Sequence, residues 1–232
     1  MFSHLLSSKT RALQVISMLL ITMGLTGCFL PDKQTDAPPT GALVLIHQSP
    51  MLPELEVFIN GTLLTTLSNG EISDSFDLEA IDHEISFRFT GASEDFATTE
   101  LITFYDQQVH VLALSGTFDL PEIIEVTRPL PELLADEHWI SVLDLSDRLD
   151  GFKLFQGREE VLLLPQEELL SEFIAVVADP EVRLSLSDIS GASIVDTSPR
   201  VSFLGMDATL IVIRPIIDED DYYMIDTIPL LR

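Results

Sequence analysis

Short stretches in which apolar and polar residues alternate recur along most of this chain. In Leu55–Ile59 and again in Ile85–Phe89 every second residue is apolar, which is the period of a strand with one face in a core. The pairs Asn60-Gly61 and Asn69-Gly70 follow such stretches, and Asn-Gly tolerates the positive φ angles of tight turns. The pattern predicts an all-β chain with strands of about five residues, typical of sandwiches or barrels.

The second half of the chain repeats the pattern of the first. Glu84–Phe89 aligns with Glu181–Leu186 at an offset of 97 residues, and Leu101–Ala113 aligns with Val201–Ile213 at an offset of 100. A nearly constant offset predicts internal duplication, with repeats of about the size of an immunoglobulin-like sandwich. We therefore expect two tandem immunoglobulin-like β-sandwich domains.

An apolar segment precedes the repeats. Lys9 and Arg11 are followed by a run without charge from Ala12 to Leu25, which is the layout of a secretory signal peptide. The run is shorter than the roughly 20 residues that a membrane-spanning helix requires. It ends in Leu25-Thr26-Gly27-Cys28, which contains the only cysteine of the chain.

This ending resembles the lipobox of bacterial lipoproteins. The resemblance implies cleavage between Gly27 and Cys28 and acyl chains on Cys28, which would anchor an extracytoplasmic protein to a membrane. An uncleaved membrane anchor is the alternative. In Gram-negative lipoproteins an Asp after the cysteine favours the inner membrane. Phe29 stands there in this chain, so the resemblance implies the outer membrane if the envelope is of that kind.

These features predict the domain organisation. Arg128-Pro129-Leu130-Pro131 predicts a stiff joint between the repeats, because the residue before a proline avoids helical conformation. We expect a signal peptide in residues 1–27, a lipidated cysteine and flexible linker in 28–40, a first sandwich in 41–127, a proline-rich joint in 128–138, a second sandwich in 139–216, and an acidic tail in 217–232 that can add an edge strand.

Charge narrows the choice of partners. The chain has 38 acidic and 12 basic residues, for a formal net charge of −26. Nucleic-acid binding requires basic patches that neutralise phosphate, so we expect no nucleic-acid partner. Apolar residues make up 46% of the chain, which is enough to build a core in spite of the charge.

One segment carries a family signature. His47-Gln48-Ser49-Pro50 is followed by Pro53 and by a strand that ends in Asn60-Gly61. This resembles the bacterial family called domain of unknown function 4397, which has the pattern His-x-Ser-Pro before an alternating strand. The resemblance covers about residues 41–126 and implies exported, tandem immunoglobulin-like domains without established catalytic residues. The motif itself predicts architecture, with His47 binding the loop backbone and the prolines ending a strand.

The chain offers two candidate metal sites and no catalytic signature. It has no paired-histidine zinc motif, nucleophile elbow or phosphate-binding loop. Two acidic clusters supply oxygen ligands of the kind that calcium prefers. They are Asp144, Asp147 and Asp150 in one expected loop, and Asp218, Asp220 and Asp221 in another. Neither matches the calcium loop of EF-hands, and we expect no other cofactor.

Together these features favour a lipid-anchored protein of the cell envelope. We expect a non-catalytic binding or structural module whose partner is an envelope protein or a glycan. A metal-dependent or hydrolytic envelope enzyme is one alternative, and a passive spacer is another. A pocket with converging histidines and carboxylates would favour the enzyme.

Overall fold

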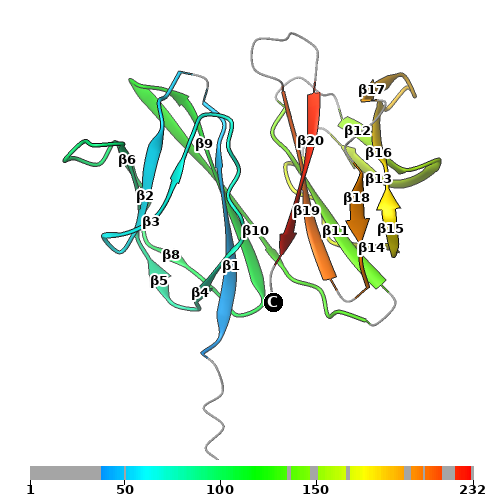
Figure 1. Cartoon of the computed structure of the whole chain (residues 1–232), viewed down its shortest axis with the longest axis horizontal. Coiled ribbons are helices and arrows are strands. Elements are labelled where there is room, and N and C mark those ends of the chain that lie inside the picture. The colour runs from blue at the N-terminus through cyan, green and yellow to red at the C-terminus, as the bar shows by residue number, and fades with distance from the viewer. Residues whose placement is uncertain are drawn as a thin grey trace, which may run out of the picture. The chain divides into compact units, whose positions relative to one another are not determined.

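The computed structural model describes residues 38–49, 51–134, 137–146, 151–165, 168–195, 200–205, 207–215 and 223–230. Residues 38–232 fold as one unit, and every regular element described in it is a β-strand (Figure 1). The all-β prediction is therefore confirmed.

The strands of the first half are β1 (Thr40–His47), β2 (Leu55–Ile59), β3 (Thr62–Leu67), β4 (Phe76–Glu79), β5 (Asp82–His83), β6 (Ile85–Phe89), β7 (Ala97–Thr98), β8 (Ile102–Thr103), β9 (Gln108–Thr117) and β10 (Leu120–Pro129). The strands of the second half are β11 (Glu137–Asp144), β12 (Gly151–Gln156), β13 (Glu159–Pro165), β14 (Ile174–Val177), β15 (Asp179–Val182), β16 (Leu184–Asp188), β17 (Ser193–Val195), β18 (Val201–Phe203), β19 (Asp207–Pro215) and β20 (Tyr223–Leu230).

The two halves have the same strand order. The first half forms the sheets β10-β9-β1-β4 and β3-β2-β6-β7, and the second forms β20-β19-β11-β14 and β13-β12-β16-β17. Each half adds a small sheet, β5-β8 or β15-β18. The pairs β1–β9 and β11–β19 are parallel, and the other described strand pairs are antiparallel.

The four large sheets stack as layers with three apolar cores. Within the first half, Leu43 and Leu45 of β1 pack with Val57 of β2 and Phe87 of β6. The second half has an equivalent core between its two sheets, which contains Phe152. Each half is thus a β-sandwich. A third core joins the β1–β9 sheet to the β11–β19 sheet, and it consists of Ala42, Val44, Ile46, Val109, Val111, Ala113, Leu143, Leu145, Leu170, Ala208, Leu210, Val212, Ile228 and Leu230.

This third core explains why four strands have continuous apolar runs. Residues 41–47 of β1 are all buried, so both faces of the strand are covered. The central residues of β9, β11 and β19 are buried in the same way. A strand covered on both faces loses the alternating pattern. Each fully buried Val or Leu stabilises the fold by about 1.5–3 kcal/mol, and the joined sheets resemble a domain interior more than a surface contact.

The structure corrects the alignment of the two repeats. Val57 pairs with Phe87, and its counterpart Leu154 pairs with Leu186, so β16 follows β6 by 99 residues instead of 97. Val109 corresponds to Ala208, which makes the offset of β19 also 99 instead of 100. A slip of one residue exchanges the two faces of a strand. Val109 and Ala208 both lie in the core that joins the two sandwiches.

The first Asn-Gly pair forms the expected hairpin turn. Asn60 and Gly61 have φ angles of 50° and 77° and connect β2 to β3. The side chain of Asn60 also accepts a hydrogen bond from the backbone N–H of Glu84 at 2.9 Å. At the second pair only Gly70 has a positive φ, of 76°, and the N–H of Glu71 donates to the carbonyl of Ser68. This second turn is therefore of a different type.

The predicted joint and tail both contribute strand residues. β10 continues through Arg128 and Pro129, and β11 begins at Glu137. At the other end of the chain β20 pairs with β19 along Ala208–Pro215, as β10 pairs with β9. The last part of the predicted acidic tail therefore contains an edge strand, which is the counterpart of β10.

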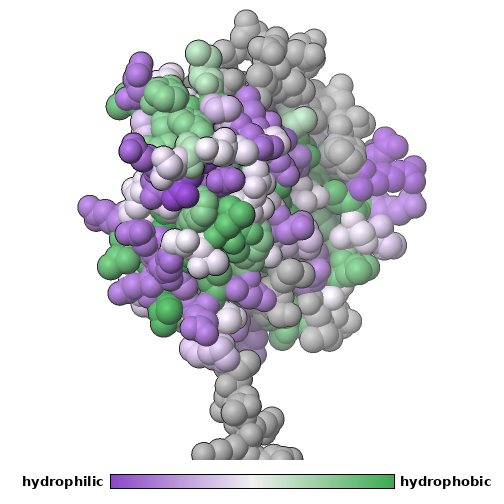
Figure 2. Space-filling view, turned by 60° about the vertical axis from the view of Figure 1, so that its left-hand side comes forward, coloured by the Kyte–Doolittle hydropathy of each residue, from purple (hydrophilic) through white to green (hydrophobic). Residues whose placement is uncertain are grey.

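On the side of the molecule that Figure 2 shows, hydrophilic and hydrophobic side chains are mixed, with green areas near the upper end and near the centre. In the described ranges no helix is long and apolar enough to cross a bilayer.

Candidate functional site

The residues proposed from sequence as anchor and metal ligands fall mostly outside the described ranges. Gly27 and Cys28 lie outside them, as do Asp147, Asp150, Asp218, Asp220 and Asp221. Asp144 is described and buried, and its carboxylate accepts a hydrogen bond from the N–H of Ser146 at 2.8 Å. Among the residues that the structure describes, no three His, Cys, Asp or Glu side chains form a group suited to a metal ion.

The family-like motif lies where β1 ends, and each of its side chains has a different partner. The Nε2–H of His47 donates to the carbonyl of Pro53 at 2.9 Å, within its own loop. The side-chain amide of Gln48 donates to the carbonyl of Leu145 at 2.7 Å, in the second sandwich. The hydroxyl of Ser49 donates to the carbonyl of Gly116 at 2.5 Å, in the β9–β10 hairpin. The architectural interpretation of His47 is confirmed, since it binds the loop backbone.

All four described histidines are buried in the packing of the sandwiches. His83 donates from Nε2 to the carbonyl of Glu79 at 3.0 Å. The ring of His110 stacks on Phe104 at 4.1 Å between centroids, and Thr127 lies 3.2 Å from its Nδ1. His138 donates from Nδ1 to the carbonyl of Leu204 at 2.6 Å. Buried rings bonded in this way serve the fold and have little access to a substrate.

Burial also keeps two of these histidines neutral. Desolvation lowers the pKa of His47, although the Pro53 carbonyl and the nearby Glu71 carboxylate oppose the shift. Desolvation lowers the pKa of His110 to about 4. Near neutral pH both imidazoles are uncharged, which matches the absence of a described partner for His47 Nδ1 and His110 Nε2.

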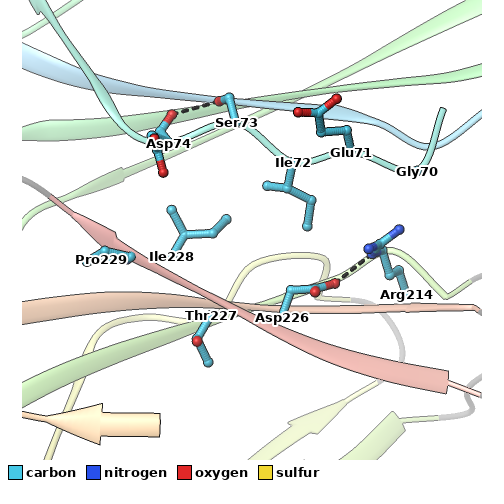
Figure 3. Close-up of a pocket in the computed structure, with 10 residues that line it drawn as sticks. All are labelled: Gly70, Glu71, Ile72, Ser73, Asp74, Arg214, Asp226, Thr227, Ile228 and Pro229. Atoms are coloured by element: carbon cyan, nitrogen blue, oxygen red, sulfur yellow. Dashed lines mark hydrogen bonds and ion pairs between the residues drawn. The ribbon is translucent and has the colours of Figure 1, made fainter. Parts of the chain in front are cut away.

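A cleft opens beside the motif, between the two sandwiches. Its volume is about 350 Å³, and the backbone carbonyl of Glu71 on its wall accepts from the N–H of His47. Figure 3 shows Ile72 and Ile228 pointing into the cleft from opposite sides, with Arg214 and Glu71 toward one end. Its lining residues are Gly70, Glu71, Ile72, Ser73, Asp74, Arg214, Asp226, Thr227, Ile228 and Pro229.

The rim of the cleft is polar and mostly acidic. The guanidinium of Arg214 donates from Nε to Asp226 Oδ2 at 2.6 Å, and both side chains are shielded in part. Glu71 binds the N–H of Ser68 at 2.8 Å. Such a cleft, with an apolar floor and a polar rim, suits a small polar ligand or a side chain of a partner better than acid–base chemistry, because Arg214 and Asp226 bind each other and Glu71 binds the backbone.

A repeated serine shapes the wall of this cleft. The Oγ of Ser73 accepts from the N–H of Leu45 at 2.9 Å and donates to the carbonyl of Asp74 at 2.7 Å. Ser171 makes the same two bonds, with Val142 and with Glu172. This pair of serines was not predicted, although the similarity of Ile72-Ser73-Asp74 and Leu170-Ser171-Glu172 is visible in the sequence.

In the second sandwich the loop that corresponds to residues 70–74 is bound by an arginine of the first sandwich. There Arg128 of β10 donates from Nη2 to the carbonyl of Leu170 at 2.6 Å, and its Nε lies 3.5 Å from Glu172 Oε1. On the cleft side Asp74 stands in the place of Glu172, and the described β20 strand offers no basic residue to it. Among the described residues, an arginine of the facing edge strand therefore binds only one of the two corresponding loops.

Removing the Ser49 hydroxyl tests the structural role of the motif. We expect Ser49→Ala to lower the free energy of unfolding by about 1–2 kcal/mol, because the half-buried Gly116 carbonyl loses the donor that the buried Ser49 provides. Urea unfolding at neutral pH measures this. Ser190→Ala, which removes an exposed hydroxyl bonded to Asp188, should change stability by less than about 0.5 kcal/mol. Equal losses in the two variants would contradict the role assigned to Ser49.

No protein-family model matches this chain, and no curated protein sequence is significantly similar to it.

Proposed function

We propose that this chain is a lipid-anchored protein of the cell envelope that acts as a non-catalytic binding or structural module. The observation that carries the proposal is the sequence Leu25–Cys28 at the end of an apolar run that follows two basic residues. Two acyl chains or more on one cysteine hold a protein firmly on a bilayer. The proposal includes an extracytoplasmic location, the outer membrane where there is one, and two immunoglobulin-like domains similar to those of domain of unknown function 4397.

The body of the chain supports a role as a rigid module. Its two sandwiches are joined by a continuous apolar core and by the hydrogen bond from Gln48 to Leu145. A body joined in this way holds its surface loops at fixed positions, which favours recognition because little order must be gained on binding. The use of the histidines in packing favours the same interpretation over a hydrolytic enzyme.

The cleft beside β20 is the candidate site for a ligand of this module. Its apolar floor of Ile72 and Ile228 and its acidic rim fit a segment of an envelope protein or a glycan, since both present polar groups around an apolar face. The net charge of −26 repels anionic lipid and nucleic acid. A passive spacer would need the rigid body but not the cleft.

Replacing the lipidated residue tests the proposal. We expect Cys28→Ser to move the protein from the membrane fraction to the soluble fraction of the expressing bacterium, because the thioether to the lipid can no longer form. Immunoblotting of the two fractions measures the change. Leu30→Ser is the matched control, since it keeps the thiol and the apolar run. A Cys28→Ser protein that stays with the membranes would overturn the anchor.

A further inference from the structure

Three phenylalanine rings form a cluster at one end of the first sandwich. Phe89 lies 4.5 Å from Phe96 and 5.2 Å from Phe118 between ring centroids, and Phe96 lies 5.7 Å from Phe118. Phe89 and Phe96 also pack against the core of the first sandwich. Phe118 extends the cluster outward and is 63% exposed. The exposed ring is therefore held in place by two rings that are fixed from below.

The β9–β10 hairpin positions this cluster. Phe118 lies in the turn that connects the two strands, beside Leu120, which is 76% exposed. Gly116 in this hairpin has a φ of 86°, and a Cβ at this position would collide with the Leu120 carbonyl. Ser49 fixes the Gly116 carbonyl from below. The fold therefore holds an aromatic ring at the surface on a constrained turn.

The cluster lies at the end of the sandwich opposite the start of β1. β9 runs parallel to β1, so both strands end on the same side of the sandwich. The β9–β10 hairpin therefore lies at the end where β1 stops, and Thr40, where β1 starts, lies at the opposite end. Met51, in the loop after β1, is 70% exposed at the same end. Exposed apolar side chains gathered in one place mark interaction sites, and a patch of this kind is visible near the top of Figure 2. We define Phe89, Phe96, Phe118, Leu120 and Met51 as the aromatic tip.

Acidic residues surround the aromatic tip and indicate the chemistry of its partner. Asp119 directly follows Phe118 and Glu94 lies two residues before Phe96, and both carboxylates are exposed. Glu54 in the adjoining loop binds the Thr90 hydroxyl at 3.0 Å. Asp95 is paired with Arg88 at 2.8 Å, so the other three carboxylates leave the tip with a negative rim. This rim and the net charge of −26 oppose contact with anionic lipid or with a second copy of the chain.

We propose that the aromatic tip docks a basic segment of another protein, with an arginine on the exposed face of Phe118 and an apolar side chain beside it on Leu120. An arginine over an aromatic ring is attracted by the ring quadrupole, and this chain already contains such a pair, with the guanidinium of Arg88 4.3 Å from the Phe58 centroid. Asp119 and Glu94 receive the flanking positive charges. The inference rests on the proposed binding role and is independent of the anchor at Cys28.

The test measures binding of the full-length protein in detergent to a synthetic peptide in which arginines alternate with leucine and tryptophan. The comparison peptide has serine at the apolar positions and the same charge. We expect the apolar peptide to bind more tightly, and we expect Phe118→Ser to weaken its binding at least about tenfold. Val177→Ser, which changes a residue 72% exposed on β14, is the matched control and should leave binding unchanged.

Two further measurements complete the test. Leu120→Ser removes an exposed side chain that is not part of the ring cluster. We expect it to weaken binding of the peptide too, and this loss could not be explained by a hairpin that Phe118→Ser had loosened. Asp119→Asn should weaken binding more at low salt than at high salt. Equal affinity of the wild type and both tip variants would overturn the inference. So would tip-dependent binding to neutral phosphatidylcholine vesicles, or tip-dependent dimerisation, without binding of the peptide. None of these outcomes bears on the membrane location, which the Cys28→Ser fractionation decides.

Discussion

Replacing Leu210 by Asp is expected to unfold both sandwiches together. Leu210 is fully buried in the core that joins the two central sheets, where an unpaired carboxylate has neither water nor a cation. Burial of an unpaired charge is among the few single changes that cost more than about 4 kcal/mol. Circular dichroism and urea unfolding of the purified protein measure the loss.

A graded variant and a surface control accompany this change. Leu210→Ala should lower the free energy of unfolding by about 2–5 kcal/mol through the cavity that it leaves. Leu163→Asp, on β13 where the leucine is about half exposed, should cost less than about 1 kcal/mol, as most surface changes do. If Leu210→Asp melts like the control, the joined core does not contribute to stability and the four-layer account is wrong.

Acidification is expected to destabilise the protein through His110 before most carboxylates titrate. The pKa of this histidine falls from 6.5 to about 4 on folding because the ring is buried. Between these values the unfolded chain binds a proton that the folded chain does not, so stability decreases as the pH falls. The full effect is about 3 kcal/mol, of which about 2 kcal/mol is lost by pH 5.

The comparison is urea unfolding at pH 7.5 and pH 5 in the wild type and in His110→Gln. The variant is expected to be less stable at both values, since the ring stack with Phe104 is lost, but its stability should change less between them. His47 contributes in the same direction, because burial lowers its pKa as well. Identical pH dependence in the two proteins would show that His110 is not the titrating group.

The sequence predicted the elements that local physics determines. Alternation in Leu55–Ile59 and the Asn60-Gly61 pair sufficed for β2 and its hairpin, since one face of that sheet is exposed and the turn depends on two residues only. The sequence did not predict the apolar core that joins the two sandwiches. A continuous apolar run such as Ala42–Ile46 shows that both faces of a strand are covered, but it carries no information on which sheet covers the second face.

The repeat alignment went wrong for a related reason. Apolar strands are similar to one another at several offsets, and only cross-strand partners such as Val57 with Phe87 fix the register. The cleft could not be predicted, because its lining comes from segments far apart in the sequence, namely residues 70–74, Arg214 and residues 226–229. The structural role of His47 was predicted correctly, since a histidine next to Ser-Pro at a strand end has backbone carbonyls within reach.

Differential scanning calorimetry of the chain from Phe29 onward tests the central claim most directly, which is that the two sandwiches fold as one unit. The shared apolar core predicts a single transition whose calorimetric and van't Hoff enthalpies agree. Two resolved transitions, each with about half of the total enthalpy, would mean that the two sandwiches unfold independently.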